Sequence, residues 1–265
     1  ILGLALGVLI VSPQLIVIRV SKPHDSVSGG AQLPTWDGIR HVLRNRPFWL
    51  VMGVYLTSWT AVSIVAADLV YFARYNLGVP DQASYFVLVA QGVALLFIPV
   101  VVAIARRREK RNAVLVGFGS MIPVLLLLGY VPASHHYIGY LLAPLLGLGI
   151  ATAYVTPWSM IPDVIDWDQR STGVRREASY YAIVSFFQKA GTAVALWLMA
   201  QALDSGGYIT PSAGETLPQQ PVEALTAIRL FITVVPSALL AVSLMFAVAY
   251  PISRQVHLEL RAELE

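Results

Sequence analysis

Long uninterrupted runs of apolar residues alternate with polar connections along almost the whole chain. A helix needs about 20 residues to span the hydrocarbon core of a bilayer, and only a helix satisfies its own backbone within one continuous run of this length. A transmembrane β-barrel is not favoured, because its short segments of alternating hydrophobicity are not seen. We therefore expect an all-α polytopic membrane protein with seven apolar segments, the first of marginal length: roughly 1–18, 48–73, 84–105, 113–131, 137–161, 178–203 and 224–252.

The composition supports this class. Hydrophobic residues make up 57% of the 265 residues and charged residues only 12%, whereas an average soluble domain carries about twice that charge. The chain is therefore expected to contact a lipid bilayer. The isoelectric point near 9.2 is compatible with nucleic-acid binding, but the basic residues are scattered among connections, and we expect no nucleic-acid partner. Cysteine is absent, which excludes thiol nucleophiles and Cys-ligated metals.

The basic residues predict the orientation of the helices. The apolar segments divide the connections into two alternating sets, and one set holds 15 of the 18 lysines and arginines. Because cytoplasmic loops are enriched in these residues, this set and the C-terminus are expected in the cytoplasm, in a multi-pass protein of the plasma (inner) membrane. The set comprises Arg19, Lys22, Arg40, Arg44, Arg46, Arg106, Arg107, Arg108, Lys110, Arg111, Arg170, Arg175, Arg176, Arg254 and Arg261.

The connection 21–47 is expected to be a cytoplasmic central loop in two parts. Residues 21–34 are rich in Ser, Gly and Pro, which indicates a loose segment. Thr35 is a candidate N-cap for a following amphipathic helix. That helix either lies on the membrane surface or is a solvated linker helix. Its apolar positions are Trp36, Ile39, Val42 and Leu43.

Segment 137–161 is rich in small residues and proline. Small residues permit helices to approach closely, and proline permits bends. Close packing accounts for the glycines, whereas a cavity lining would also account for the polar and aromatic residues of the same segment; both interpretations remain open. The polar and aromatic residues are Thr152, Tyr154, Thr156 and Trp158.

One lysine, Lys189, lies in the middle of segment 178–203. A cation at mid-bilayer costs on the order of 3 kcal/mol or more unless it faces protein or water. Snorkelling is not favoured, because either end of the segment is roughly 16–21 Å away. A structural ion pair and a role at a transport site both remain open. The residues that share an arc of about 80° on this helix include Tyr181, Ser185, Lys189 and Thr192, and Gln188 lies just beside it.

A connection crowded with charge leads into this segment, and the two together carry a family resemblance. The sequences PDVIDWDQRSTGVRREASYY, FFQKAG and GGY (from Pro162 to Tyr208) resemble the loop between helices ten and eleven, and then helix eleven, of the melibiose-permease-type sugar–cation symporters. These form the glycoside–pentoside–hexuronide branch of the major facilitator superfamily. LRNRPFWLV (43–51) is similar to that family's entry into helix seven. The resemblance covers nearly the whole chain; its loop signature is moderately specific for the branch but not for a substrate.

The resemblance implies the C-terminal half of a twelve-helix transporter, whose partner is an N-terminal six-helix half. Residues 1–20 would be the end of helix six, 21–47 the central loop, 48–252 the C-terminal six-helix bundle and 253–265 a cytoplasmic tail. The family's cation-binding carboxylates and most of its sugar contacts belong to the N-terminal half. Asp68, the only acidic residue within a predicted span, matches no family site and is expected to be an interface residue.

The resemblance also implies roles for individual residues. Lys189 matches the family's membrane-embedded lysine near the cation site, and Tyr154 falls where melibiose permease has a tryptophan beside the sugar. Substrate or cation-site candidates are Lys189, Tyr154, Tyr181, Ser185, Gln188, Thr192 and Trp158. Charges expected to pair with the other half when the cytoplasmic side closes, unless they are only a solvated cluster, are Asp163, Asp166, Arg175, Arg176 and Glu177.

The predicted function is cation-coupled symport of a small solute by alternating access. The solute is most readily a sugar or glycoside, with Na⁺ or H⁺ as coupling ion and no cofactor or bound metal. A lysophospholipid or another solute is the alternative within the superfamily, and a non-transporting membrane scaffold is the alternative if the piece exists alone. A membrane-embedded enzyme is not favoured, because no nucleophile–base pair or metal-ligand spacing shares a helix.

Overall fold

The computed structural model describes residues 11–12, 36–211 and 217–251. The helices discussed below belong to one compact unit, residues 34–265. Thr35, the C-terminal tail (253–265) and, apart from residues 11 and 12, the expected end of helix six (1–20) lie outside the described residues.

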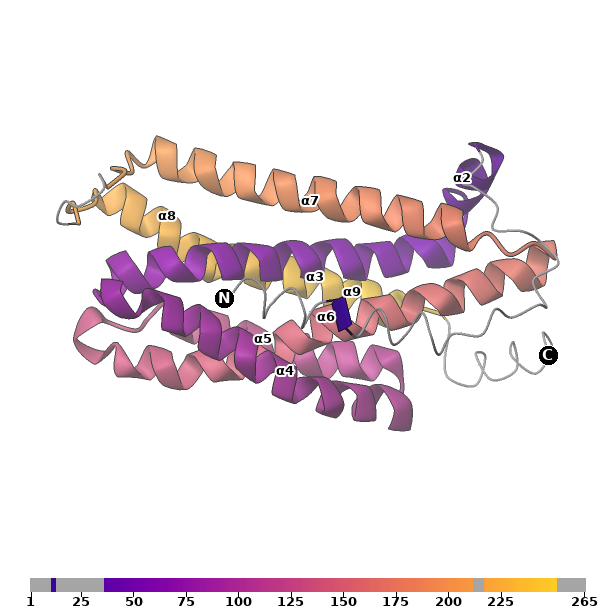
Figure 1. The fold of residues 1–265 in the computed structure, drawn as a ribbon, viewed down its shortest axis with the longest axis horizontal. Helices are drawn as coiled ribbons and strands as arrows, with labels where there is room; N and C mark the ends of the chain where they lie inside the picture. Colours follow the sequence, from indigo (N-terminus) through magenta and orange to yellow (C-terminus); the bar gives the residue numbers. More distant parts are fainter. Residues whose placement is uncertain (1–10, 13–35, 212–216, 252–265) are drawn as a thin grey trace. The chain divides into compact units, whose positions relative to one another are not determined.

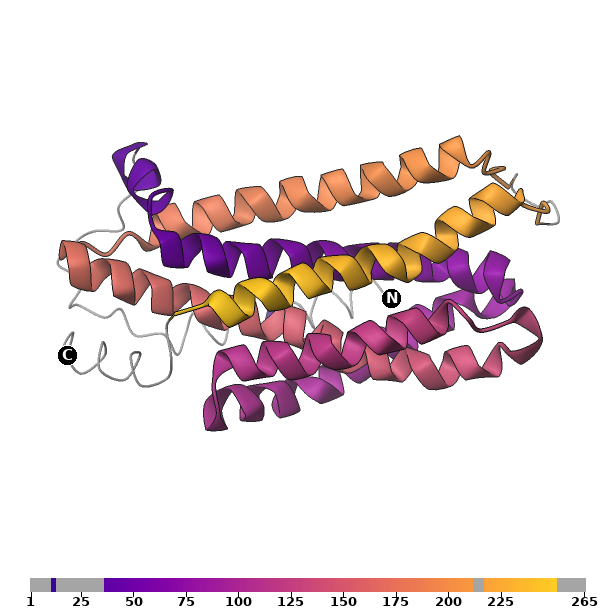
Figure 2. The same cartoon turned by 180° about the vertical axis from the view of Figure 1, so that it is seen from behind.

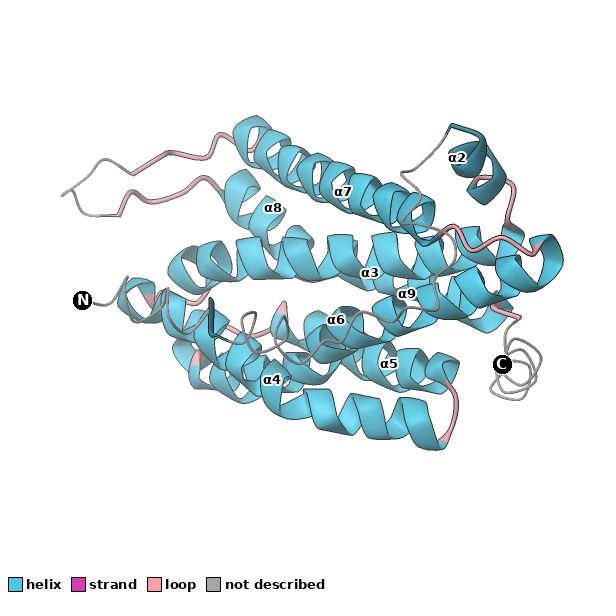
Figure 3. Ribbon diagram, turned by 45° about the vertical axis from the view of Figure 1, so that its right-hand side comes forward, coloured by secondary structure: helices cyan, strands magenta, loops and turns pink. Residues whose placement is uncertain are grey.

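The described residues are helical nearly throughout and contain no strand (Figures 1 and 3). Six stretches are long and apolar enough to cross a membrane, which confirms the predicted all-α polytopic fold. The elements are α2 (Trp36–Val42), α3 (Arg46–Tyr71), the π-helical turn η1 (Phe72–Asn76), η2 (Pro80–Gln82), α4 (Ala83–Arg107), α5 (Lys110–Leu128), η3 (Ala133–His135), α6 (Tyr137–Thr172), α7 (Glu177–Ser205), α8 (Val222–Ile232) and α9 (Val234–Ala249).

Helix α6 is longer than the sequence pattern predicts. The apolar segment was expected to end at residue 161 and a charged loop to follow, but α6 continues to Thr172. Asp163, Asp166 and Asp168 therefore lie on its last turns, and the connection to α7 is only 173–176. The helix ends at Gly173, whose left-handed φ of 69° suits a residue without a Cβ.

The last predicted segment, 224–252, is two helices rather than one. Helix α8 ends at Ile232 and α9 begins at Val234, with Thr233 between them. Pro236 has no amide hydrogen to donate to the carbonyl of Ile232, four residues earlier, so a continuous helix loses a hydrogen bond at this point. The prediction of a single continuous helix is therefore wrong: the segment is interrupted near one third of its length.

Helix α3 lies at the centre of the bundle. It packs against α4, α6, α7, α8 and α9, and Figures 1 and 2 show it from the two opposite sides. Helix α6 packs against α4 and α5. A Cβ on Gly147 would lie 2.9 Å from the backbone nitrogen of Ala94 on α4, and one on Gly149 would overlap Met121 on α5. The glycines of α6 thus permit close helix packing.

The short helix α2 stands at one end of the bundle, beside the start of α7 (Figure 3). Val42 is fully buried and Ile39 is half-buried, so these two residues form its inner face. Trp36 is 79% exposed and Leu43 is 41% exposed. The expected amphipathic helix is present, but Trp36 does not share the buried face of its apolar neighbours.

Candidate functional site

An unbroken row of aromatic rings crosses three helices in the middle of the bundle. We call it the aromatic row: Tyr154, Trp59, Tyr55, Trp158 and Tyr181, from α6, α3, α3, α6 and α7. Neighbouring ring centroids are 5.7, 5.8, 5.4 and 6.4 Å apart in this order. Within the row, Tyr55 is fully buried, whereas the other four residues are half-buried. The row therefore presents ring surface that a ligand could stack against.

Two hydrogen bonds hold Trp59 and Tyr154, at one end of the row. Trp59 donates from Nε1 to the Oγ1 of Thr192 on α7, at 3.1 Å. The Tyr154 hydroxyl lies 3.2 Å from the side-chain nitrogen of Gln91 on α4. Polar groups with packed aromatic rings are a common lining of small-molecule sites. The arrangement can orient a solute that has both an apolar face and polar edges.

Helix α7 turns the predicted polar face toward this row. Tyr181 stacks on Trp158, with an interplanar angle of 16°, and Thr192 accepts the bond from Trp59. Lys189 lies on the same arc between them and is exposed. Within the described part of the chain, Lys189 makes no hydrogen bond or ion pair. Lys189 therefore lies exposed on the helix that supplies Tyr181 and Thr192.

Ser185 and Gln188 are half-buried on the same helix. The structure thus brings Tyr154, Trp158, Tyr181 and Thr192 into one contact network. Ser185, Gln188 and Lys189 lie on the helix that borders it, but none of their side chains joins the contacts described here.

Sequence reasoning missed the α3 and α4 members of this network. Tyr55, Trp59 and Gln91 were not among the predicted site residues. Tyr55 and Trp59 are four residues apart and so lie on one helix face, and an aromatic pair at this spacing in segment 48–73 was the available signal. Gln91, the polar residue in an otherwise apolar stretch of segment 84–105, was a second signal.

A separate set of charges gathers at the end of the bundle that holds the connections 108–109 and 173–176, here called the basic end. Lys110, at the start of α5, donates at 2.7 Å to both carboxylate oxygens of Asp163 on α6, and at 2.6 Å to the carbonyl of Ser159. The Asp163 side chain is only 4% exposed and that of Lys110 is 28% exposed. The pair therefore ties α5 to α6 in a largely buried setting.

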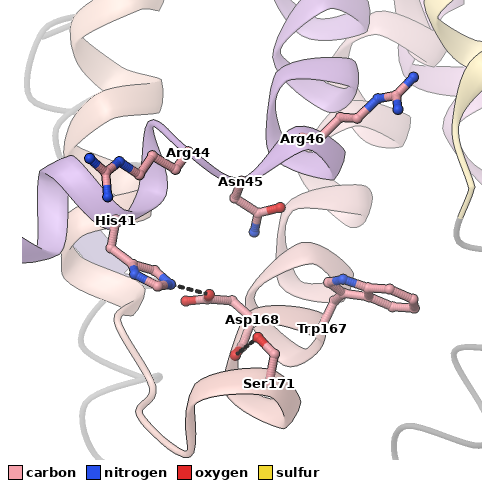
Figure 4. A pocket seen from close by; sticks show the side chains of 7 residues that line it. All are labelled: His41, Arg44, Asn45, Arg46, Trp167, Asp168 and Ser171. Carbon is pink, nitrogen blue, oxygen red and sulfur yellow. Dashed lines mark hydrogen bonds and ion pairs between the residues drawn. The ribbon is translucent and has the colours of Figure 1, made fainter.

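Asp168 connects three elements at the basic end. Its Oδ1 lies 3.1 Å from Nε2 of His41 on α2, and its Oδ2 accepts a 3.3 Å hydrogen bond from Nη1 of Arg176, just before α7. Figure 4 shows His41 pointing at Asp168, and both residues line a cavity of about 320 Å³. The cavity is lined by His41, Arg44, Asn45, Arg46, Trp167, Asp168 and Ser171.

Arg175 forms two further ion pairs at the basic end. It bonds Asp166 at 2.8 Å and also contacts Glu177. Partial burial would lower the pKa of the Arg175 guanidinium, but the hydrogen bonds and charges of Glu177 and Asp166 outweigh it and raise the pKa above its ordinary value. The predicted gating charges are thus all engaged with partners in this chain. Their pairing with another half stays a prediction.

Comparison with known proteins places the chain among transporters. An uncharacterised symporter from the cyanobacterium Synechocystis is 38% identical over 93% of this chain and 46% of its own length. The sodium-dependent lysophosphatidylcholine symporter 1-B of Danio rerio is 28% identical over 96% of this chain and 48% of its own length. The corresponding human symporter 1 is 26% identical, over 96% and 46% of the two lengths.

The chain therefore spans about half the length of these relatives. All three are named as symporters, which are transport proteins and not enzymes. With its six apolar helices the chain is an integral, multi-pass membrane protein. The family model described as MFS/sugar transport protein matches residues 1–254, so this chain belongs to that family of the major facilitator superfamily.

Proposed function

We propose that this chain forms the C-terminal half of a secondary active transporter, which moves a small solute together with Na⁺ or H⁺ by alternating access. Residues 48–252 would form the C-terminal bundle and pair with an N-terminal six-helix bundle. The symporter names of the relatives support coupling to an ion. In such transporters the solute site lies near the bilayer midplane, between the two bundles.

The observation that carries the proposal is the aromatic row with Lys189 beside it. The rings of Trp59, Trp158 and Tyr181 are half-buried and so retain accessible surface. An exposed cation within an apolar helix is expensive in lipid but reasonable against a polar cavity or a partner bundle. The row would contact the solute, and Lys189 would face the ion site, with Ser185, Gln188 and Thr192 as additional polar contacts.

Lys189 gives coupling a physical basis. If its partner is a carboxylate of the N-terminal half, each charge stabilises the other. A cation that enters the site would compete with Lys189 for that carboxylate, loosen one contact between the bundles and shift the equilibrium between the alternating states. The paired charges of the basic end, Asp163, Asp166, Arg175, Arg176 and Glu177, would exchange partners between this half and the other as that side opens and closes.

Two solute classes are in competition. The description of the family favours a sugar or glycoside, and the aromatic row suits the apolar face of a sugar ring. The names of several relatives favour a lysophospholipid. The sugar is the leading proposal because the row supplies flat ring surface with hydrogen-bonding groups at its edges, at Gln91 and Thr192.

Counterflow in liposomes tests the function. The full-length protein should exchange a labelled sugar or glycoside when loaded with the same solute, and Na⁺ or acid should drive accumulation. Exchange of a lysophosphatidylcholine without any sugar exchange would assign the alternative solute. Absence of exchange across a broad panel of both classes, by folded protein, would refute the transport proposal.

Orientation is tested separately. The basic end is proposed to lie in the cytoplasm of a plasma-membrane protein, together with the C-terminus. Single cysteines replacing Arg108 and Asp81, which lie in connections at opposite ends of the bundle, should react with a membrane-impermeant thiol reagent from opposite sides. The absence of native cysteine removes the background. Labelling of both from one side would contradict the proposed topology.

A further inference from the structure

Asp68 is a carboxylic acid enclosed by the bundle without any partner. It lies near the end of α3, its residue is 0% exposed, and neither carboxyl oxygen has a hydrogen-bond partner. The sequence predicted an interface residue at this position, but the structure encloses Asp68 among this chain's own helices. A cationic side chain from another half could not reach it without opening the bundle.

The charged residues on the elements packed against α3 do not neutralise Asp68. Helix α9 has no titratable side chain, and those on the near ends of α4 and α6 are tyrosines. Every lysine, arginine, aspartate or glutamate on the neighbouring η1, α7 and α8 that could approach this level is exposed and forms no ion pair with Asp68 in the described part of the chain. They are Arg74, Asp204, Glu223 and Arg229.

An ionised carboxylate in such a place is costly, because it loses its hydration without gaining a counter-charge. The group therefore needs a cation of its own. Hard metal ions take about six or more oxygen ligands, and no hydroxyl or amide side chain of the described residues contacts the oxygens of Asp68. A proton needs no further ligand, so a proton is the cation that this site fits.

Two helical irregularities lie near Asp68: the π-helical turn η1 and the interruption between α8 and α9. Directly after Asp68, α3 passes into the π-helical turn Phe72–Asn76, a feature often found at functional sites. Two hydrogen bonds fix how α8 and α9 align with α3 and η1. Ser243 on α9 donates to the carbonyl of Val54 on α3, and Asn76 on η1 donates to the carbonyl of Leu225 on α8. Interpolation between these bonds places Asp68 about level with the α8–α9 interruption. Interrupted helices mark ion and substrate sites in transporters.

We propose that Asp68 is a proton-binding site inside the C-terminal bundle, closed to solvent in this conformation and opened when η1 and the α8–α9 interruption change shape. The site is far from Lys189 in register and at the end of the bundle opposite the basic end. It would load and release its proton on that side. The link to transport rests on the proposed function, but the presence of the proton does not.

The first experiment detects the proton itself. Infrared spectra of the purified full-length protein in lipid nanodiscs should contain the carbonyl band of a protonated carboxylic acid at a pH where exposed carboxylates are ionised. Asp68→Asn should remove this band, Asp68→Glu should shift it, and Asp81→Asn, a change at an exposed aspartate, should leave it intact. The Glu variant keeps the test decisive if the Asn variant does not fold.

Two outcomes would overturn the proposal. A band of equal size in the parent and in Asp68→Asn would mean that Asp68 carries no proton. A band that Asp68→Asn removes, but that also disappears from the parent when Na⁺ is added at constant pH, would assign the site to sodium. Neither measurement depends on knowing the solute.

A transport measurement then tests whether the proton on Asp68 is coupled to solute uptake. With a solute identified by counterflow, acid outside should accelerate uptake by the parent and by Asp81→Asn but not by Asp68→Asn, while counterflow at equal pH persists in all three. Uptake by Asp68→Asn that keeps the full acid dependence would overturn the transport link. If the parent exchanges no solute at all, the proposed function fails and the infrared result still decides whether Asp68 is a proton site.

Discussion

Charge is handled in opposite ways at the basic end and on the α7 face beside the aromatic row. At the basic end, Asp163 is nearly buried but held by Lys110 at 2.7 Å, and Asp168 contacts both His41 and Arg176. On the α7 face, Lys189 is exposed within a membrane-length helix and has no partner among the described residues. The first arrangement holds helices together, whereas the second leaves a charge ready to interact with something else.

This difference predicts that changes at the basic end alter stability, and that changes on the α7 face alter transport.

The largest expected effect is on transport by Lys189→Leu in the full-length protein. Accumulation driven by an ion gradient should fall to background, while expression and thermal stability remain close to those of the parent, because no contact of the described bundle is lost. Lys189→Arg should rescue poorly, since a planar guanidinium does not replace a compact ammonium. Uptake into proteoliposomes provides the measurement.

Arg229→Leu is the matched control, because Arg229 is also an exposed cation on a membrane-length helix. It should accumulate solute like the parent. If Lys189→Leu does so as well at equal expression, Lys189 is structural and the contrast between the two regions disappears.

The next effect is on stability. Asp163→Asn removes the charge that Lys110 faces, and breaking a buried pair from one side costs about 3–5 kcal/mol. We expect the lower end of this range, because Lys110 retains some access to water. The free energy of unfolding in denaturant measures it. Glu109→Gln, at a more exposed pair with Arg111, should change that free energy far less; equal losses in the two variants would show that burial does not set the energy.

A smaller effect is expected in the aromatic row. Trp59→Ala should weaken solute affinity about tenfold, equivalent to about 1.4 kcal/mol. Trp59→Phe keeps a ring but loses the hydrogen bond to Thr192 and should cost about 1 kcal/mol or less. Competition in counterflow measures both. Trp197→Ala, at an exposed tryptophan of α7 that is not part of the row, should leave affinity unchanged, and a comparable loss there would remove the row from the solute site.

The smallest effect is expected for Arg175→Ala. Its ion pairs are on the surface, with 44% of the Arg175 side chain exposed, and exposed pairs contribute about 0–1 kcal/mol. The midpoint of thermal unfolding should shift only slightly, and added salt should reduce the shift further. A loss as large as that of Asp163→Asn would mean that the basic end acts as one unit rather than as separate pairs.

Much of the fold was predictable because apolar length alone identifies membrane helices. The pattern located six spans, but it misplaced their ends and missed the interruption in the last one. Residues 162–172 were interpreted as a loop because three aspartates and Arg170 lie in this stretch, yet Ile161, Val164, Ile165 and Asp168 are buried at helical spacing. That spacing was the overlooked signal. Pro236 likewise marked the interruption between α8 and α9, whereas no sequence signal was recognised for the π-helical turn.

The candidate site was predictable only along single helices. Helical spacing grouped Tyr181, Ser185, Lys189 and Thr192 on one face of α7, and the structure places Tyr181 in the aromatic row and Thr192 in a hydrogen bond with Trp59. Contacts between helices depend on how each helix is rotated in the bundle, which the pattern of one segment does not fix. Trp59 and Tyr55 were missed for this reason, as was the enclosure of Asp68.

The length of α6 has a mechanical consequence. Its 36 residues amount to about 54 Å at 1.5 Å per residue, against a hydrocarbon core of about 30 Å. The turns after residue 160 form an arm that lengthens α6 by roughly 18 Å and carries Asp168. A tilt of about 10° would displace the tip of such an arm by roughly 3 Å, which exceeds the tolerance of a hydrogen bond. The arm therefore magnifies small rotations in the middle of the bundle into the making or breaking of the contact between Asp168 and His41.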